Sequence, residues 1–236
     1  MRSFIVMAMF LTSFASAAAG DYKEIRDLTV DASGVETLVM HVGAGSLDVR
    51  GVEGLDSIDV KATIVIPDAD DDKGRKVIVK KLTLTLESDG SVVDLKSSFK
   101  QGLWSSGSGG RVDLEVRAPS RLAITIDDGS GSIGVSNFSA DMRIDDGSGS
   151  MNIQKVASVN IDDGSGSIDI SGASGDVYIN DGSGSIAVEA VGGTVTIDDG
   201  SGSIRVNDVA EDLIILDDGS GSVSFSDVRG TVEQDG

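Results

Sequence analysis

The sequence predicts an all-β protein, a single right-handed parallel β-solenoid with about 18 residues per coil and irregular N-terminal coils. The first observation behind this prediction is a repeated phrase, Asp-Asp-Gly-Ser-Gly-Ser-Ile, which opens at Asp127 and returns, with small changes, at steps of 18, 17, 18, 18 and 19 residues. The second is that apolar and polar residues alternate in short runs, which is typical of strands. The third is the absence of cysteine, so stability must come from burial and backbone pairing.

Residues 1–19 are predicted to be an export signal that is removed. Arg2 supplies a positive charge, a short apolar run follows from Phe4 to Phe14, and small residues lead to a cleavage site after Ala19. The apolar run is shorter than the roughly 20 residues that a membrane span needs, and no later segment is apolar enough. A lipoprotein anchor needs a cysteine, which this chain lacks. We therefore expect an exported protein, periplasmic or secreted to the cell surface, with no membrane span.

The charge of the chain limits its partners. The formal net charge is −20, and residues 121–236 hold 21 acidic and five basic residues. Nucleic acid and anionic lipid surfaces are predicted to be poor partners, because phosphate binding needs clustered cations. An acidic surface suits solubility, cations or a basic partner. Aromatic residues make up 4% of the chain, so stacking platforms for sugars or bases are scarce.

Residues 20–120 are predicted to form irregular solenoid coils interrupted by loops, with almost no helix. A weak copy of the repeat, Gly-Ala-Gly-Ser-Leu-Asp-Val, starts at Gly43 and indicates that the solenoid begins near residue 35. An acidic bulge is expected at Asp68–Lys73, a hairpin turn at Ser88–Ser91, and a Gly/Ser-rich loop at Lys100–Gly110. The predicted strands are Leu38–Val42, Ser46–Val49, Ile58–Ile66, Val77–Val79, Leu82–Leu86, Val92–Leu95 and Val112–Val116.

Two features of this first half could mediate contacts. The basic cluster is a charged edge that discourages strand-to-strand aggregation, or else a contact for the acidic repeats within the chain or in a partner. Its members are Lys73, Arg75, Lys76, Lys80 and Lys81. Trp104 is either a loop residue folded onto an apolar surface or an exposed anchor for a partner.

Residues 121–236 are predicted to form the regular repeats. Aligned copies have five apolar columns, so each coil has two short strands whose inward residues stack into buried ladders. The columns are Ile124, Met142, Val159, Val177, Val195 and Ile214; Ile126, Ile144, Ile161, Ile179, Ile197 and Leu216; Ile133, Met151, Ile168, Ile186, Ile204 and Val223; Val135, Ile153, Ile170, Val188, Val206 and Phe225; and Phe138, Val156, Ala173, Val191, Val209 and Val228.

The repeated phrase is predicted to be a corner of the coil. Gly129, Gly131 and their equivalents allow close backbone approach, and the second aspartate can accept amide hydrogen bonds from its own turn. Stacking also places aspartate over aspartate, and two carboxylates about 4.8 Å apart repel by about 0.9 kcal/mol in water. This cost suggests strong turn hydrogen bonding or cations between coils. The candidate cation ladder is Asp128, Asp146, Asp163, Asp181, Asp199 and Asp218.

The familiar calcium-binding nonapeptide is not present. That motif places aspartate sixth, after its glycines, whereas this chain has core residues such as Ile133 and Ile168 in that position. The prediction is no cofactor and no metal, with a different Ca²⁺ site on the stacked aspartates as the alternative.

No catalytic residues are predicted, and we expect a protein that is not an enzyme. The acids form uniform ladders, whereas an active site needs unlike groups gathered once, and the only histidine, His41, sits in a strand pattern. A glycan-acting β-helix enzyme remains the second alternative. Binding to ice or a crystal surface ranks last, because the serines lie in turns rather than on a strand face.

With these motifs, residues 28–230 resemble the bacterial DUF4097 family of putative adhesins. The resemblance rests on the Gly43–Val49 coil, on Val112–Pro119 leading into the repeats, and on the recurring Gly-Ser-Gly-Ser-Ile. It implies an extracytoplasmic β-solenoid without assigned catalytic residues. The expected function is a structural, adhesin-like or interaction module of the cell envelope, whose partner is an envelope or surface protein or a glycan. Self-association through the C-terminal solenoid edge is also expected.

Overall fold

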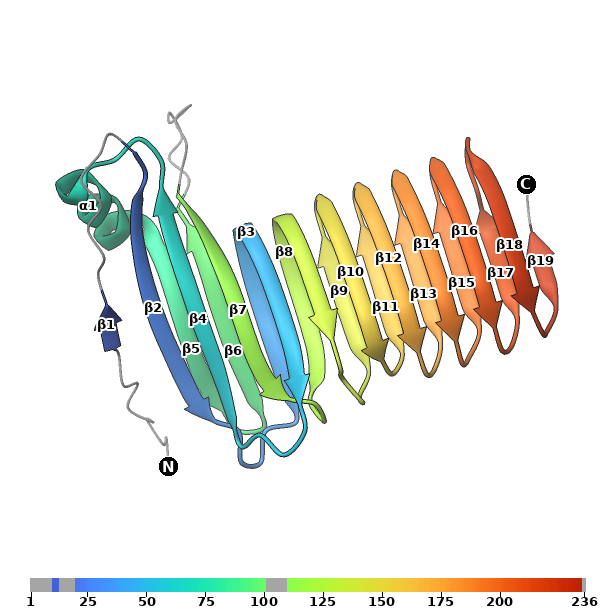
Figure 1. The fold of residues 1–236 in the computed structure, drawn as a ribbon, viewed down its shortest axis with the longest axis horizontal. Coiled ribbons are helices and arrows are strands. Elements are labelled where there is room, and N and C mark those ends of the chain that lie inside the picture. The colour runs from blue at the N-terminus through green and yellow to red at the C-terminus, as the bar shows by residue number, and fades with distance from the viewer. Residues whose placement is uncertain (1–9, 13–19, 101–109, 235–236) are drawn as a thin grey trace.

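The computed structural model describes residues 10–12, 20–100 and 110–234, which form one long β structure (Figure 1). The strands lie side by side along the long axis, with α1 at one end and the C-terminal coils at the other. The elements are β1 (Phe10–Thr12), β2 (Tyr22–Asp31), β3 (Thr37–Val52), β4 (Ser57–Ile66), α1 (Asp71–Lys81), β5 (Leu82–Asp89), β6 (Val92–Phe99), β7 (Arg111–Pro119), β8 (Ala123–Ser136), β9 (Met142–Asp146), β10 (Gly149–Val156), β11 (Val159–Asp163), β12 (Gly166–Ala173), β13 (Val177–Asp181), β14 (Gly184–Val191), β15 (Val195–Asp199), β16 (Gly202–Val209), β17 (Leu213–Asp217), β18 (Ser222–Val228) and β19 (Val232–Gln234).

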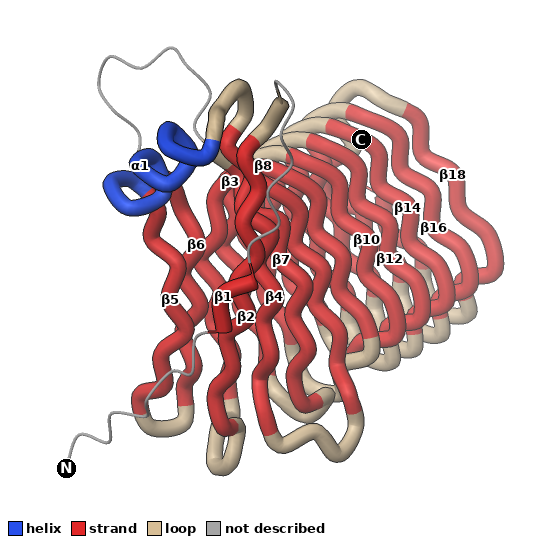
Figure 2. The backbone as a smooth tube through the Cα atoms, turned by 60° about the vertical axis from the view of Figure 1, so that its left-hand side comes forward, coloured by secondary structure: helices blue, strands red, loops and turns tan. Residues whose placement is uncertain are grey.

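The repeats confirm the predicted β-solenoid. From β9 to β16 each coil holds a five-residue strand followed by an eight-residue strand, and each strand pairs in parallel with its counterpart one coil away. The five-residue strands and the eight-residue strands thus form two faces with a thin apolar core between them. Figure 2 shows the turns of successive coils lying in a row, one beside the next, along the solenoid.

The apolar columns are confirmed in every coil but the last. Ile161 stacks between Ile144 and Ile179, and all three side chains are completely buried. In β17 the prediction is wrong by one residue, because Leu213 and Ile215 occupy the columns there instead of Ile214 and Leu216. The preceding step is 19 residues long, and the register shift after Ile197 absorbs the extra residue as a bulge that leaves Leu216 exposed.

The weak repeat copy is confirmed as a coil of the stack. β3 runs parallel to β8, with Gly45 beside Gly131, Leu47 beside Ile133 and Val49 beside Val135. Both strands are long enough to pass the corner and contribute to both faces. Val42 lies beside Asp128, so β3 provides an apolar neighbour where the later coils have aspartate.

The other strands of residues 20–120 pair mainly in antiparallel fashion. β2 pairs with β4, β4 with β7, and β5 with β6, the last through the predicted turn at Ser88–Ser91. Only β5 and β6 are joined by a tight turn, whereas β2 and β4, and β4 and β7, are separated by other elements in the chain. This end is therefore a mixed sheet joined to the solenoid through β3, β7 and β8.

The predicted strand at Val77–Val79 and the second half of the predicted bulge at Asp68–Lys73 are wrong, because α1 begins at Asp71 and covers these positions. The Asp70 side chain accepts a 2.8 Å hydrogen bond from the Lys73 amide and caps the helix. Acidic residues in the first turn and lysines in the last favour the helix dipole. The run Val77-Ile78-Val79 resembles a short strand, but the Asp70 cap and the order of charges favour a helix.

Several expectations fall on residues outside the described ranges. Trp104 lies there, as does most of the predicted signal, of which residues 10–12 form β1 beside β2. If the signal is removed, this edge of β2 becomes free. Within the described ranges no helix is long and apolar enough to cross a membrane.

Candidate functional site

One outer face of the molecule continues from the mixed sheet into the repeats. It runs through β2, β4, β7, β3, β8, β10, β12, β14, β16 and β18. Because side chains alternate along strands, its outward positions line up in rows across all these strands. One row passes from Asp59 through Arg117 and Arg50 to Ser136 and onward to Gln154. We call this surface the ladder face.

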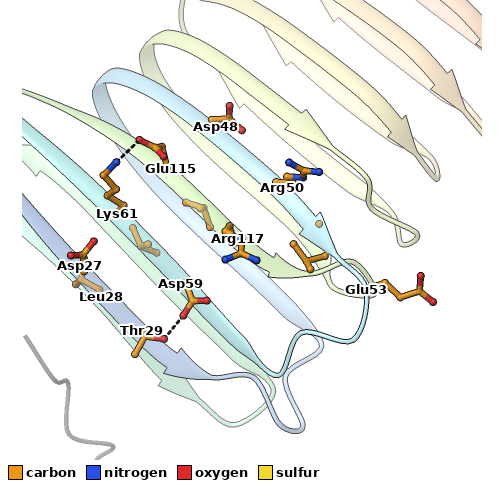
Figure 3. Close-up of a pocket in the computed structure, with 14 residues that line it drawn as sticks. Asp27, Leu28, Thr29, Asp48, Arg50, Glu53, Asp59, Lys61, Glu115 and Arg117 are labelled. Carbon is orange, nitrogen blue, oxygen red and sulfur yellow. Dashed lines mark hydrogen bonds and ion pairs between the residues drawn. The ribbon is translucent and has the colours of Figure 1, made fainter.

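The ladder face is hollowed over the mixed sheet, where the hollow encloses about 930 Å³ (Figure 3). Arg50 and Arg117 project over it from adjacent strands. Two of the five acids that line the hollow have other partners: Lys61 Nζ lies 3.1 Å from Glu115 Oε1, and Asp59 accepts hydrogen bonds from Thr29 and Ser57. Asp27, Asp48 and Glu53 also line it. Among the described residues, neither guanidinium forms an ion pair or a side-chain hydrogen bond within these distances. Both can therefore serve an external acceptor.

A second hollow on the same face lies over the repeats and encloses about 610 Å³. Its lining combines five uncharged polar residues with three charged ones and with apolar residues. The polar residues are Asn152, Ser171, Asn207, Ser224 and Ser226, and the charged residues are Asp169, Glu189 and Arg205. Hydroxyl and amide groups at regular spacing can exchange hydrogen bonds with an extended polar partner.

The corner aspartates of the candidate cation ladder are buried. Asp128, Asp146, Asp163, Asp181 and Asp199 lie beside one another in successive coils and are at most 4% exposed. In each, Oδ1 accepts the amide of the serine two residues on, at 3.0–3.3 Å. The predicted turn-capping role of the aspartate is therefore confirmed.

The second oxygen of each buried aspartate has no partner. Oδ2 of all five is inaccessible and makes no hydrogen bond in the described structure. Burial, followed by repulsion from Asp146, raises the pKa of Asp128 to about 7 and that of Asp163 to about 6. Burial raises the pKa of Asp181 to about 6 and also raises the pKa values of Asp146 and Asp199. A neutral carboxyl avoids the cost of a buried unpaired charge.

Asp218 does not continue this ladder. After the bulge in β17, Asp217 lies beside Asp198 and caps the turn by accepting the Gly219 amide at 2.8 Å. Asp218 is half-buried and instead accepts a 2.9 Å hydrogen bond from Gln234 Nε2. Asp218 therefore follows Asp217 in the predicted register, but it lacks the burial and the turn-capping role of the five aspartates before it.

The first aspartates of the doubled pairs face outward. Asp127, Asp145, Asp162, Asn180, Asp198 and Asp217 lie in one column. At the end of this column His41 Nδ1 lies 3.1 Å from Asp127 Oδ2, and both side chains are well exposed. The two aspartates of each pair thus have different roles, since the inner one caps the turn and the outer one faces solvent.

The buried ladder fits a metal ion poorly. Among the described residues, no three or more His, Cys, Asp or Glu side chains are grouped so as to hold one. Each space between coils offers two carboxylates, whereas Ca²⁺ takes six to eight oxygen ligands. The unpartnered Oδ2 atoms are the one observation that favours a cation.

Sequence reasoning missed the arginine pair. Arg50 and Arg117 are 67 residues apart in the chain, and only the β3–β7 register makes them neighbours. Nothing in the pattern around either residue indicates that pairing.

Comparison with known proteins finds a similar fold in solved structures. No family model matches the chain, and no curated protein matches it. A "putative adhesin" from Bacteroides fragilis is similar over 89% of this chain and 97% of its own, with 14% identity and a TM-score of 0.55. A "putative cell adhesion protein" from Clostridium sporogenes covers 91% and 100%, also at 14% identity, with a TM-score of 0.36. At this identity the first likeness shows a shared fold.

Proposed function

We propose that the protein is an exported, non-enzymatic, adhesin-like interaction module of the cell envelope and a member of the DUF4097 family. The repeat motifs and their order support the family assignment, and the fold shared with a "putative adhesin" agrees with the function. The predicted signal supports export.

The ladder face is the observation that carries this proposal. It presents polar side chains in straight rows over ten strands, and its hollow contains two arginines that lack internal partners. A rigid, repetitive surface suits an extended partner, such as a polysaccharide or a strand-rich surface protein, because many weak contacts add up along it. Such a surface needs no catalytic group.

The test is a binding screen of the purified protein on glycan and envelope-protein arrays. We expect saturable binding that Arg50→Gln/Arg117→Gln weakens at least tenfold, because two charge-assisted hydrogen-bonding groups are lost. Arg143→Gln, on the opposite face, is the matched control and should bind like the unmodified protein. Equal binding by all three proteins would remove the ladder face from the proposal.

A second candidate function is cation binding by the aspartate ladder, favoured by the unpartnered Oδ2 atoms. Cation binding would raise the melting temperature with excess Ca²⁺ and lower it with EDTA. Equal melting temperatures in both would exclude this candidate.

Self-association through the last coils is also part of the proposal. In β18 Phe225 is 45% exposed, whereas Val206, its counterpart one coil earlier, is fully buried. A free strand edge with apolar side chains can pair with another copy. Light scattering should show a mass that rises with concentration, and Phe225→Ser should lower it; a constant monomer mass would contradict self-association.

A further inference from the structure

Helix α1 is attached to the end of the mixed sheet by few contacts. Gly74 packs against the ring of Tyr22 in β2, so closely that a methyl group at this position would overlap the ring. Ile78 is the other buried residue of the helix. The remaining side chains are exposed or half-buried, so most of the helix surface has no partner within the described chain.

The second half of this helix is strongly basic. Residues 73–81 hold five cations and no acid, in a chain with a net charge of −20. Lys100 adds a sixth, because its amide donates to the Lys81 carbonyl at 2.9 Å. Within the described residues none of these six forms an ion pair. Asp71 and Asp72 lie in the first turn, so the two charge signs are separated along the helix.

The basic surface also contains apolar side chains. Val79 is 84% exposed, the largest value among the exposed large hydrophobic residues. A hollow of about 530 Å³ on the same helix is lined by lysines and Val77, with two acids at the start of the helix. Its lining residues are Asp70, Asp72, Lys73, Lys76, Val77, Lys80 and Lys81. Lysines around an apolar residue are typical of helices that bind membrane surfaces.

The acidic repeats of the same chain cannot occupy this surface. In Figure 1, α1 lies at one end of the molecule and β9 to β19 extend toward the other. This separation also weakens the repulsion between the acidic repeats and an anionic surface bound to α1, because interactions between charges farther apart than about 8 Å are largely screened at physiological ionic strength.

We propose that α1 docks the protein on an anionic phospholipid surface, with its lysines against the phosphate groups and Val79 entering the interface. The molecule then stands on its mixed-sheet end and projects its repeats away from the lipid. This goes beyond the ladder face proposed above, and it revises the expectation from total charge that anionic lipid is a poor partner. Each cation held near such a surface raises binding about fivefold, so the cluster suffices for measurable, salt-sensitive binding.

The test is co-sedimentation of the purified protein with vesicles of phosphatidylcholine containing 30% phosphatidylglycerol, and with vesicles of phosphatidylcholine alone. We expect binding only to the anionic vesicles, with a large loss between 0.1 M and 0.5 M salt. Lys76→Glu/Lys80→Glu should weaken binding more than about 25-fold, because two attractive charges are lost and two repulsive ones are added. Val79→Ser should weaken it several-fold.

The matched control is Arg143→Glu/Arg229→Glu, which makes the same charge change in the repeats and should leave vesicle binding unchanged. Circular dichroism melts confirm that each variant is folded. Absence of binding to anionic vesicles, or equal binding by the helix variant and its control, would overturn the proposal. So would displacement by 10 mM inorganic phosphate at constant ionic strength, since the ligand would then be a single phosphate group. A failed array screen for the ladder face would leave this result untouched.

Discussion

The mixed sheet and the repeats handle charge in opposite ways. In the mixed sheet, different residues face each other across strands, so Lys61 can pair with Glu115 at 3.1 Å. In the repeats each residue faces its own equivalent, so Asp163 lies between Asp146 and Asp181. A stack of near-identical coils builds a continuous core from short strands, but it also repeats every unfavourable neighbour. The buried ladder is the place where this cost is concentrated.

The two regions also differ in how closely their turns approach. In the repeats a methyl group on Gly166 would overlap the carbonyl oxygen of Gly149 in the adjacent coil, and Gly166 has φ of 149°. At the Gly90 hairpin of the mixed sheet, φ is 65° and no atom lies within 4 Å of that position. Glycine is required by the neighbouring coil in one region and by its own backbone in the other.

The largest expected effect follows from this difference. Gly166→Ala should destabilise the protein by more than about 4 kcal/mol, because the coils must separate to admit the methyl group. Gly90→Ala should cost only about 1 kcal/mol, the left-handed conformational penalty alone. Urea unfolding followed by circular dichroism measures both. Similar losses in the two variants would contradict the close stacking of the corners.

The next effect separates the inner from the outer aspartate column. At pH 8, Asp163→Asn removes a buried charge that lowers the free energy of unfolding by about 3 kcal/mol. The buried amide that replaces it has an unpartnered group, which lowers the free energy of unfolding by about 1–2 kcal/mol. We therefore expect a net gain of about 1 kcal/mol at pH 8 and no gain at pH 4.5, where Asp163 is already neutral. The exposed control Asp162→Asn should change stability by only a few tenths of a kcal/mol. A loss at pH 8 for the inner variant would show that its carboxylate is stabilising.

A smaller effect is expected at the opposite corner of the coil. Ala190 has φ of 59°, where the equivalent residue one coil earlier is Gly172 with φ of 74°. Ala190→Gly should stabilise by about 0.5 kcal/mol, because glycine adopts this conformation without strain. Ala187→Gly, three residues earlier in β14, should destabilise the protein by a similar amount. Thermal melts that rank these two variants the other way would contradict this prediction.

The smallest effect is expected where the two regions meet. His41 and Asp127 form an exposed pair between β3 and β8. His41→Ala should change stability by less than about 0.5 kcal/mol, because exposed pairs contribute little. A change above 1 kcal/mol in urea unfolding would give this contact a structural role that the geometry does not suggest.

The sequence predicts the repeats well because each residue there is constrained by its equivalent in the next coil. Ile144, Ile161 and Ile179 reveal their shared column through period alone. The same reasoning fails where the period changes, as at Ile214 and Leu216, because alignment on the Asp-Gly phrase does not say which residue the bulge expels.

The mixed sheet is less predictable because its pairings are long-range and unique. Alternation locates its strands, but the direction of β4 relative to β7 depends on contacts that no repeat reports. Helix α1 carries a local signal in Asp70 and in its order of charges, and the short Val-Ile-Val run obscures it. The burial of the inner aspartates follows from the corner geometry and could not be inferred from their doubled sequence.

The central claim is that the buried aspartates of the repeats are neutral in the folded protein, and we call them the neutral ladder. Its most direct test is the number of protons released on unfolding at pH 5.5. The folded pKa values of Asp128, Asp163 and Asp181, about 7, 6 and 6, lie above the ordinary value of 3.8, so the folded state binds more protons between these limits. The contribution of these three groups to the free energy of unfolding is therefore fully present below about pH 4 and is lost as the pH rises through 6 to 7. We expect these three groups to release roughly two protons per molecule, and Asp163→Asn to reduce the total by about one. No release by the unmodified protein, or an unchanged release by the variant, would contradict the neutral ladder.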